Sequence, residues 1–170
     1  MSTAFWWGVA GLTVVALTLS SDTSIPARWG LLYQLHPAAR KRFLNLLLRI
    51  EARTGWTVVL TSAWRPSDTS LGYHYFGLGL DINATNGNQA LRMASTKAEW
   101  EASGIPDIIR AAGFRWGGDF TSPRNGGLPG YDPVHVDEGR RISLTNLRLL
   151  AKAQAPAGDT TRFDGRVLPV

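Results

Sequence analysis

The sequence predicts an α+β domain in which helices flank a small, mainly antiparallel sheet. The chain has 170 residues, of which 44% are hydrophobic and 18% are charged, and this composition is typical of one globular domain with a sizeable core. A helical segment comes first, and short strands interrupted by further helices follow it, which is the order of elements in α+β proteins. A hydrophobic helix is expected ahead of this domain, at the N-terminus.

The first 21 residues form a distinct segment. They include no charged side chain, and residues 4–19 are mostly apolar, with glycines and threonines among them. About 20 apolar residues can span a bilayer as a helix, whereas the basic start and the small-residue cleavage site of a signal peptide are not clearly present. Three interpretations stay open: an uncleaved membrane anchor, a cleaved signal, or a segment buried in protein. We expect a protein that is membrane-anchored or exported to the periplasm or cell wall.

A polar linker is predicted over residues 22–34, and the folded domain over residues 35–155. Pro37 is expected at the first position of a helix, where its fixed φ and missing N–H are tolerated. Apolar side chains then recur at helical spacing, and Gly55 is placed to end the helix. His36 lies just before this helix, and we interpret it as a structural or surface residue.

Beyond this helix, short runs rich in β-branched and apolar residues predict four strands. They cover residues 56–63, 78–83, 114–116 and 135–136. Pro106 is a favoured first residue for one of the later helices, and Gly113 is placed to stop it. The later helices cover residues 97–102, 106–113 and 143–153. A loop rich in glycine and proline is expected at residues 122–130, and an irregular tail at residues 156–170.

The composition narrows the chemistry that the chain can perform. The absence of cysteine excludes disulfides and thiolate zinc sites, so a metal ion must be bound by His, Asp or Glu. The net charge of +5 favours anionic partners such as nucleic acid, anionic lipid or an acidic cell-wall polymer. The basic residues form no array typical of a nucleic-acid-binding module, and we therefore expect no nucleic-acid partner.

Two of the three histidines lie in short stretches that also contain a carboxylate. His74 precedes Asp81 by seven residues, and His135 follows Asp132 by three. Two imidazoles and one carboxylate make a three-ligand zinc site whose fourth position is left for water. His74, Asp81 and His135 are therefore the candidate metal ligands. Asp132 is the candidate base that takes a proton from this water, and the pattern indicates metal-assisted hydrolysis.

The local sequence around the candidate ligands includes residues that shape the backbone. Gly77 and Gly79 are expected to let the chain bend and approach other groups closely. Asp132 and His135 would face opposite sides of a plain strand, but Pro133 lacks an N–H, so the strand is expected to begin after it. A turn at Asp132–Pro133 would direct both side chains into one cleft. On spacing alone, a turn residue that bonds the backbone is an equal alternative for Asp132.

Arg65 lies where the first predicted strand ends. A guanidinium beside a metal site suits a substrate carboxylate or the oxyanion of a tetrahedral intermediate. The alternative is an exposed arginine at a strand end, which is common in proteins. Asp119, in the turn at residues 117–119, is left outside the catalytic set because local hydrogen bonding is sufficient to explain it.

Four segments occur in an order that resembles the zinc peptidases of the D-alanyl-D-alanine carboxypeptidase and phage L-alanyl-D-glutamate endopeptidase family. They are Ser-Ala-Trp-Arg-Pro at residues 62–66, His-Tyr-Phe-Gly-Leu-Gly-Leu-Asp at 74–81, Gly-Phe-Arg-Trp-Gly-Gly-Asp-Phe at 113–120 and Asp-Pro-Val-His at 132–135. The third segment looks most like the phage endolysin branch. The resemblance covers residues 35–142.

By this resemblance, His74, Asp81 and His135 match the zinc ligands of the family. Asp132 matches the catalytic carboxylate, which is Glu in many relatives. Arg65 matches the arginine that steadies the substrate carbonyl or the tetrahedral intermediate. The resemblance implies a Zn²⁺-dependent peptidase that acts on the stem peptide of peptidoglycan, as an L-alanyl-D-glutamate endopeptidase or, alternatively, as a D-alanyl-D-alanine carboxypeptidase.

Two departures from the family are visible, and rival interpretations stay open. Gly72 stands where the family commonly has Ser, and Gly79 where it commonly has Ala. Neither position supplies a ligand, so altered backbone or substrate contacts are expected, not lost activity. A non-catalytic wall-binding protein and a structural membrane or virion protein are the rivals. We expect a monomer that can associate with membranes through residues 4–19, from a phage or a bacterium.

Overall fold

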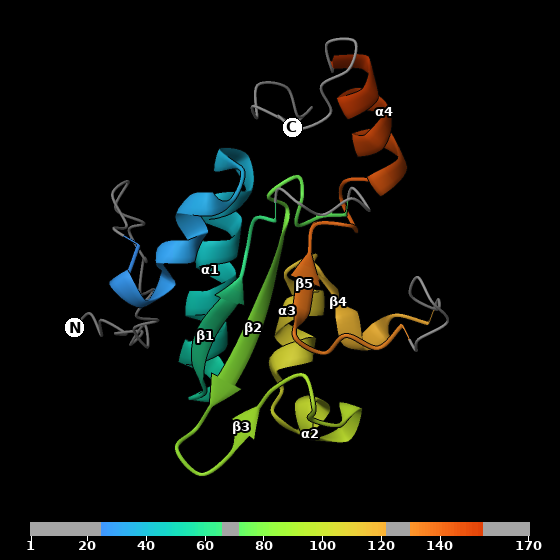
Figure 1. Ribbon diagram of the computed structural model, residues 1–170. Helices are drawn as coiled ribbons and strands as arrows, with labels where there is room; N and C mark the ends of the chain where they lie inside the picture. The colour runs from blue at the N-terminus through green and yellow to red at the C-terminus, as the bar shows by residue number, and fades with distance from the viewer. Residues whose placement is uncertain (1–24, 66–71, 122–129, 155–170) are drawn as a thin grey trace, which may run out of the picture.

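A computed structural model describes residues 25–65, 72–121 and 130–154 of the chain (Figure 1). The hydrophobic segment at residues 1–21 and the tail at residues 156–170 lie outside the described residues, as does most of the predicted loop at 122–130. Within the described parts, none of the helices combines the length and the apolar character that a bilayer span requires.

A five-stranded antiparallel sheet forms the centre of the fold, which confirms the predicted α+β class. The strands are β1 (Thr57–Ser62), β2 (Gly79–Thr85), β3 (Ala90–Leu91), β4 (Arg115–Trp116) and β5 (His135–Asp137). The order across the sheet is β1-β2-β5-β4, and β3 pairs with the far end of β2. In the β2–β5 ladder, Asp81 lies directly opposite His135. Two segments 54 positions apart in sequence therefore meet at one point.

Figure 1 shows α1 (Pro37–Thr54) and α3 (Ile105–Ala111) on one face of the sheet, whereas α4 (Leu144–Gln154) stands away from it. The remaining helices are short, namely η1 (Ala27–Gln34), α2 (Lys97–Ala102) and η2 (Gly117–Asp119). The predicted start and stop of α1 are confirmed. His36 caps it by accepting a hydrogen bond at Nδ1 from the N–H of Ala38, Pro37 is its first residue, and Gly55 ends it with a φ of 71°. His36 is therefore a structural residue, as expected.

The polar linker predicted over residues 22–34 is wrong for residues 27–34, which form the 3₁₀-helix η1. Trp29 and Leu32 on this helix are fully buried. The backbone leaves helical geometry at Trp29 (φ −110°, ψ 26°), and the side chains at and after this kink enter the core. The Trp29 indole N–H also donates to the Val58 carbonyl at 2.9 Å. The folded unit therefore includes residues from position 27 onward.

Candidate metal centre

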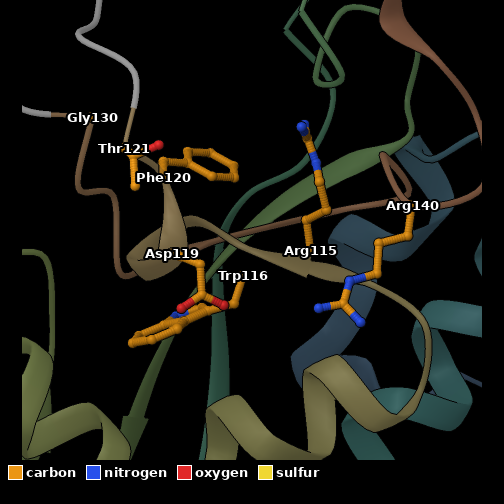
Figure 2. A pocket seen from close by; sticks show the side chains of 7 residues that line it. All are labelled: Arg115, Trp116, Asp119, Phe120, Thr121, Gly130 and Arg140. Carbon is orange, nitrogen blue, oxygen red and sulfur yellow. The ribbon is translucent and has the colours of Figure 1, made fainter.

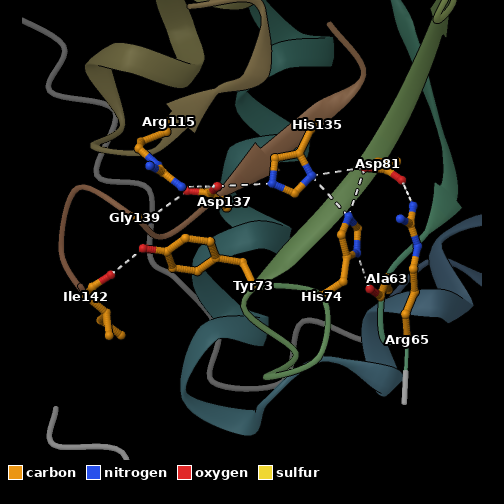
Figure 3. Close-up of polar contacts among 10 residues, drawn as sticks. All are labelled: Ala63, Arg65, Tyr73, His74, Asp81, Arg115, His135, Asp137, Gly139 and Ile142. Atoms are coloured by element: carbon orange, nitrogen blue, oxygen red, sulfur yellow. Dashed lines mark hydrogen bonds and ion pairs between the residues drawn. The ribbon is translucent and has the colours of Figure 1, made fainter. Parts of the chain in front are cut away.

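Three buried side chains converge where β2, β5 and the loop before β2 meet (Figure 3). Asp81 on β2 and His135 on β5 are cross-strand partners, and His74 comes from the turns at residues 73–77. His74 Nε2 lies 3.0 Å from Asp81 Oδ1 and 3.0 Å from His135 Nδ1, and His135 Nδ1 lies 3.1 Å from Asp81 Oδ1. Among the described residues, this is the group of His, Asp and Glu side chains that could hold a metal ion.

The outer contacts of both imidazoles determine which nitrogen faces this cluster. His74 Nδ1 is hydrogen-bonded to the Ala63 carbonyl, which can only accept. His135 Nε2 lies 3.0 Å from Asp137 Oδ2. In a neutral imidazole one nitrogen carries the proton and the other has a lone pair. With the proton of a neutral imidazole on the outer nitrogen, His74 Nε2 and His135 Nδ1 would each have a lone pair facing Asp81 Oδ1, whereas the protonated imidazole donates to this oxygen from the same atom.

In the absence of a cation, burial and hydrogen bonds within the cluster shift the pKa values of Asp81 and His135. Burial disfavours the ionised form of Asp81, but hydrogen bonds from His135 and His74 outweigh it and hold the pKa of this carboxyl well below its usual range. Burial likewise disfavours the charged form of His135, but hydrogen bonds to Asp137 and Asp81 raise its pKa to about 9. Three acceptors in one buried site require either a proton or a metal ion between them.

Arg65 lies against the metal-facing aspartate, as Figure 3 shows. Its guanidinium forms an ion pair with Asp81 Oδ2, and its Nε donates to Ser62 Oγ at 2.8 Å. Asp81 therefore has one oxygen held by Arg65 and the other turned toward the histidines. The Arg65 side chain is 48% exposed, so it also borders the solvent beside the cluster.

The two glycines of the His74 segment behave as the sequence suggested. Gly77 adopts a φ of 64°, which turns the chain back into β2. A Cβ on Gly79 would lie 3.2 Å from His135 Cε1 and 3.1 Å from Tyr73 Cβ. The departure from alanine at Gly79 thus leaves His135 a few tenths of an ångström more room than the family's common residue would.

The predicted turn at Asp132–Pro133 is present, and β5 begins after Pro133 as expected. The His135 N–H donates to the Asp132 carbonyl at 3.0 Å and closes the turn. The Asp132 N–H donates to the Gly117 carbonyl at 3.0 Å, and the Trp116 indole N–H donates to the Pro133 carbonyl at 2.7 Å. Asp132 itself is half-buried and lies outside the group of three potential ligands.

Sequence reasoning missed Asp137 and Arg115. Asp137 is fully buried and bonds the outer nitrogen of His135, and Arg115 binds both of its carboxylate oxygens. A signal was available, because residues two apart on a strand share a face, and Asp137 follows His135 by two. The partnership with Arg115 depends on the β4–β5 register, in which the two residues are directly opposite. Asp119, by contrast, bonds Arg110 and Lys97, which fits the local role expected for it.

A cavity of about 480 Å³ lies over β4 and η2 (Figure 2). Its lining consists of Arg115, Trp116, Asp119, Phe120, Thr121, Gly130 and Arg140. The Phe120 ring lies 5.8 Å from the His135 ring, between centroids. Phe120 therefore lies between the cavity and the cluster.

Comparison with known proteins gives one family. Residues 65–137 match the family model described as D-alanyl-D-alanine carboxypeptidase, which is a family of zinc peptidases. The matched range includes all five residues that the sequence singled out, from Arg65 to His135, and it confirms the resemblance. A comparison with curated proteins gave no match.

Proposed function

We propose, with this family match as the premise, that the protein is a Zn²⁺-dependent peptidase of bacterial peptidoglycan that cleaves the L-alanyl-D-glutamate bond of the stem peptide. The observation that carries the proposal is the convergence of three potential ligand atoms, from His74, Asp81 and His135, in a buried site. A family of zinc peptidases whose model spans this site supplies the reaction class.

The residues present fit a zinc ion. Zinc binds imidazole nitrogen and carboxylate oxygen at about 2.0–2.1 Å, and two ligands in tetrahedral directions are then about 3.3 Å apart. The three donor atoms are 3.0 to 3.1 Å from one another, so they need to separate only slightly. Two histidines and one carboxylate also leave a fourth position for water or substrate, as in catalytic zinc sites.

Zinc would supply a Lewis acid that makes water a nucleophile at neutral pH and polarises the scissile carbonyl. Within this proposal, Asp132 accepts the proton that the attacking water loses and delivers it to the leaving amine. The turn that Trp116 and Gly117 hold would keep the Asp132 backbone in fixed relation to His135. Arg65, half-exposed beside Asp81, would stabilise negative charge on the carbonyl oxygen.

The choice of bond rests on two features. The segment Gly113–Phe120 looks most like the endolysin branch of the family. An endopeptidase must also hold substrate on both sides of the scissile bond, and the cavity over β4 and η2 would offer space for one side. The second candidate is a D-alanyl-D-alanine carboxypeptidase, which the description of the matching model favours.

The deciding experiment is digestion of purified murein by the full-length protein, with mass spectrometry of the products. L-alanyl-D-glutamate cleavage would release peptides that begin with D-glutamate, whereas carboxypeptidase activity would release free D-alanine. A chelator should stop the reaction, and added zinc should restore it. His74→Ala, which removes a ligand, is the control for contaminating hydrolases. Cleavage by the wild type that persists in the chelator, above the level seen with this variant, would exclude the proposed zinc mechanism.

The location of the protein is part of the same proposal. Its substrate lies outside the cytoplasmic membrane, and residues 4–19 are apolar enough to direct a monomeric enzyme to or across that membrane. Fractionation of expressing cells tests this, because a full-length protein that stays wholly in the cytoplasm would contradict export or anchoring.

A further inference from the structure

We propose that Asp137, held by Arg115, is a positioning residue that sets the metal affinity of the centre by fixing the orientation of His135. The inference rests on the proposed zinc site. It concerns two residues behind that site, Asp137, which contacts His135, and Arg115, which contacts Asp137. Figure 3 shows the continuous series from Arg115 through Asp137 and His135 to the cluster. Neither Asp137 nor Arg115 contributes to the group of three potential ligands.

Asp137 is placed to bond the outer face of His135. Both residues belong to β5 and are two positions apart, so their side chains leave the strand on the same face. Asp137 Oδ2 lies 3.0 Å from His135 Nε2. A carboxylate that accepts the Nε2 proton keeps the Nδ1 lone pair directed at His74 Nε2 and Asp81 Oδ1, and it also fixes the plane of the ring.

The carboxylate is itself held by four donors. Arg115 Nε donates to Oδ1 at 2.8 Å, and Arg115 Nη2 donates to Oδ2 at 2.7 Å, which is the two-pronged geometry that guanidinium groups make with carboxylates. The Gly139 N–H donates to Oδ1 at 2.7 Å. With the bond to His135, the buried Asp137 is paired on both oxygens, so it is retained in its ionised form and in one rotamer.

Arg115 is in turn confined. Its guanidinium carbon lies 4.8 Å from the Tyr73 ring centroid and 5.1 Å from the Phe120 ring centroid. A methyl group on Gly139 would overlap the guanidinium, so a larger residue there would displace it. Arg115 holds Asp137, and Asp137 in turn holds His135. Substitution of Arg115 should therefore disturb the orientation of the His135 ring through Asp137.

The neighbouring residue provides a matched control. Glu138 is also a buried carboxylate paired with an arginine, since Arg42 Nε donates to its Oε1 at 2.7 Å. Its ion pairs are with Arg42 and Arg141 and not with a member of the cluster. Glu138→Gln therefore removes a buried charge next to Asp137 without touching the series that ends at His135.

The test measures Zn²⁺ affinity of the full-length protein by competition with a chromophoric chelator, with circular dichroism to verify folding. Asp137→Asn should weaken zinc binding by about 10- to 100-fold, because an amide has only one accepting oxygen and its NH₂ group would face donors, either Arg115 Nε and the Gly139 N–H or Arg115 Nη2 and His135 Nε2. Arg115→Met should weaken it less, and Arg115→Lys should restore part of the loss. Glu138→Gln should bind as the wild type does. The absorption spectrum of the Co²⁺-loaded protein should change in Asp137→Asn and not in Glu138→Gln.

Folded Asp137→Asn and Arg115→Met proteins that bind zinc as tightly as the wild type would overturn the inference. A loss of equal size in Glu138→Gln would also overturn it, because it would mean a general effect of buried charge. If Asp137→Asn does not fold, Arg115→Met decides, since the Arg115 side chain is 38% exposed. A wild-type protein that binds zinc but leaves murein intact would refute the proposed peptidase and leave this inference standing.

Discussion

Asp81 shows at the level of a single residue how one carboxylate serves two purposes. Its Oδ2 is bound by Arg65, and its Oδ1 is left for the two histidines. A carboxylate that is anchored at one oxygen presents the other in a fixed direction, which favours single-oxygen coordination of zinc. The arginine would therefore orient a proposed zinc ligand while it also borders the solvent.

The roles proposed for Asp132 and His74 can be separated by mutation. Asp132→Ala should keep zinc and lose about 10²- to 10⁴-fold in kcat, which is the usual contribution of a general base. His74→Ala should lose both zinc and turnover, because it removes a ligand. Metal content of the purified variants and rates on murein are the measurements. Near-normal turnover in Asp132→Ala would show that the base lies elsewhere.

The turn before β5 is the element on which both His135 and Asp132 depend. It is fixed by the Trp116 indole N–H bonded to the Pro133 carbonyl, and by the Asp132 N–H bonded to Gly117. Trp116 is almost fully buried, so this bond lies out of water. The short η2 and the two-residue β4 thus hold the turn that includes Asp132 and leads into β5 at His135.

Trp116→Phe tests this element. Phenylalanine keeps much of the packing but leaves the buried Pro133 carbonyl without its donor, which should lower the free energy of unfolding by about 1–3 kcal/mol. Turnover should fall as well, because the turn that holds Asp132 is loosened. Urea denaturation and murein digestion measure the two effects. Trp100→Phe is a comparison variant, since its indole N–H bonds the Arg92 carbonyl away from the cluster. An equal loss of turnover there would exclude a specific role for the turn.

Local signals made part of the fold and site predictable. The limits of α1 follow from Pro37 and Gly55, whose backbone preferences act within a few residues. The start of β5 after Pro133 likewise follows from the missing N–H of that proline, although the turn itself is held by Trp116 and Gly117. Features that depend on residues distant in sequence could not be predicted. The Arg115–Asp137 pair depends on how β4 and β5 align, and β3 is a strand only through its pairing with β2. Helix η1 was not predicted, because two buried residues, Trp29 and Leu32, are too few to produce a periodic pattern.

For the molecule as a whole, metal binding and stability are linked. A ligand that binds the folded chain alone stabilises it by about 2.7 kcal/mol at one hundred times its dissociation constant. For a domain of this size, that corresponds to a rise in Tm of about 5–10 °C. Zinc should therefore raise the Tm of the wild type, and His135→Ala should abolish the rise. Differential scanning calorimetry with and without zinc measures it, and a Tm that zinc leaves unchanged would contradict the proposed site.

The pairing of Asp81 with His135 across the β2–β5 ladder has a consequence for maturation. A slip of one residue along this ladder would turn Asp81 to the opposite face of the sheet, and the three donors would no longer meet. If the proposed zinc site is correct, only the native alignment would bring the three donors together, and zinc binding would then distinguish correctly paired chains from misaligned ones.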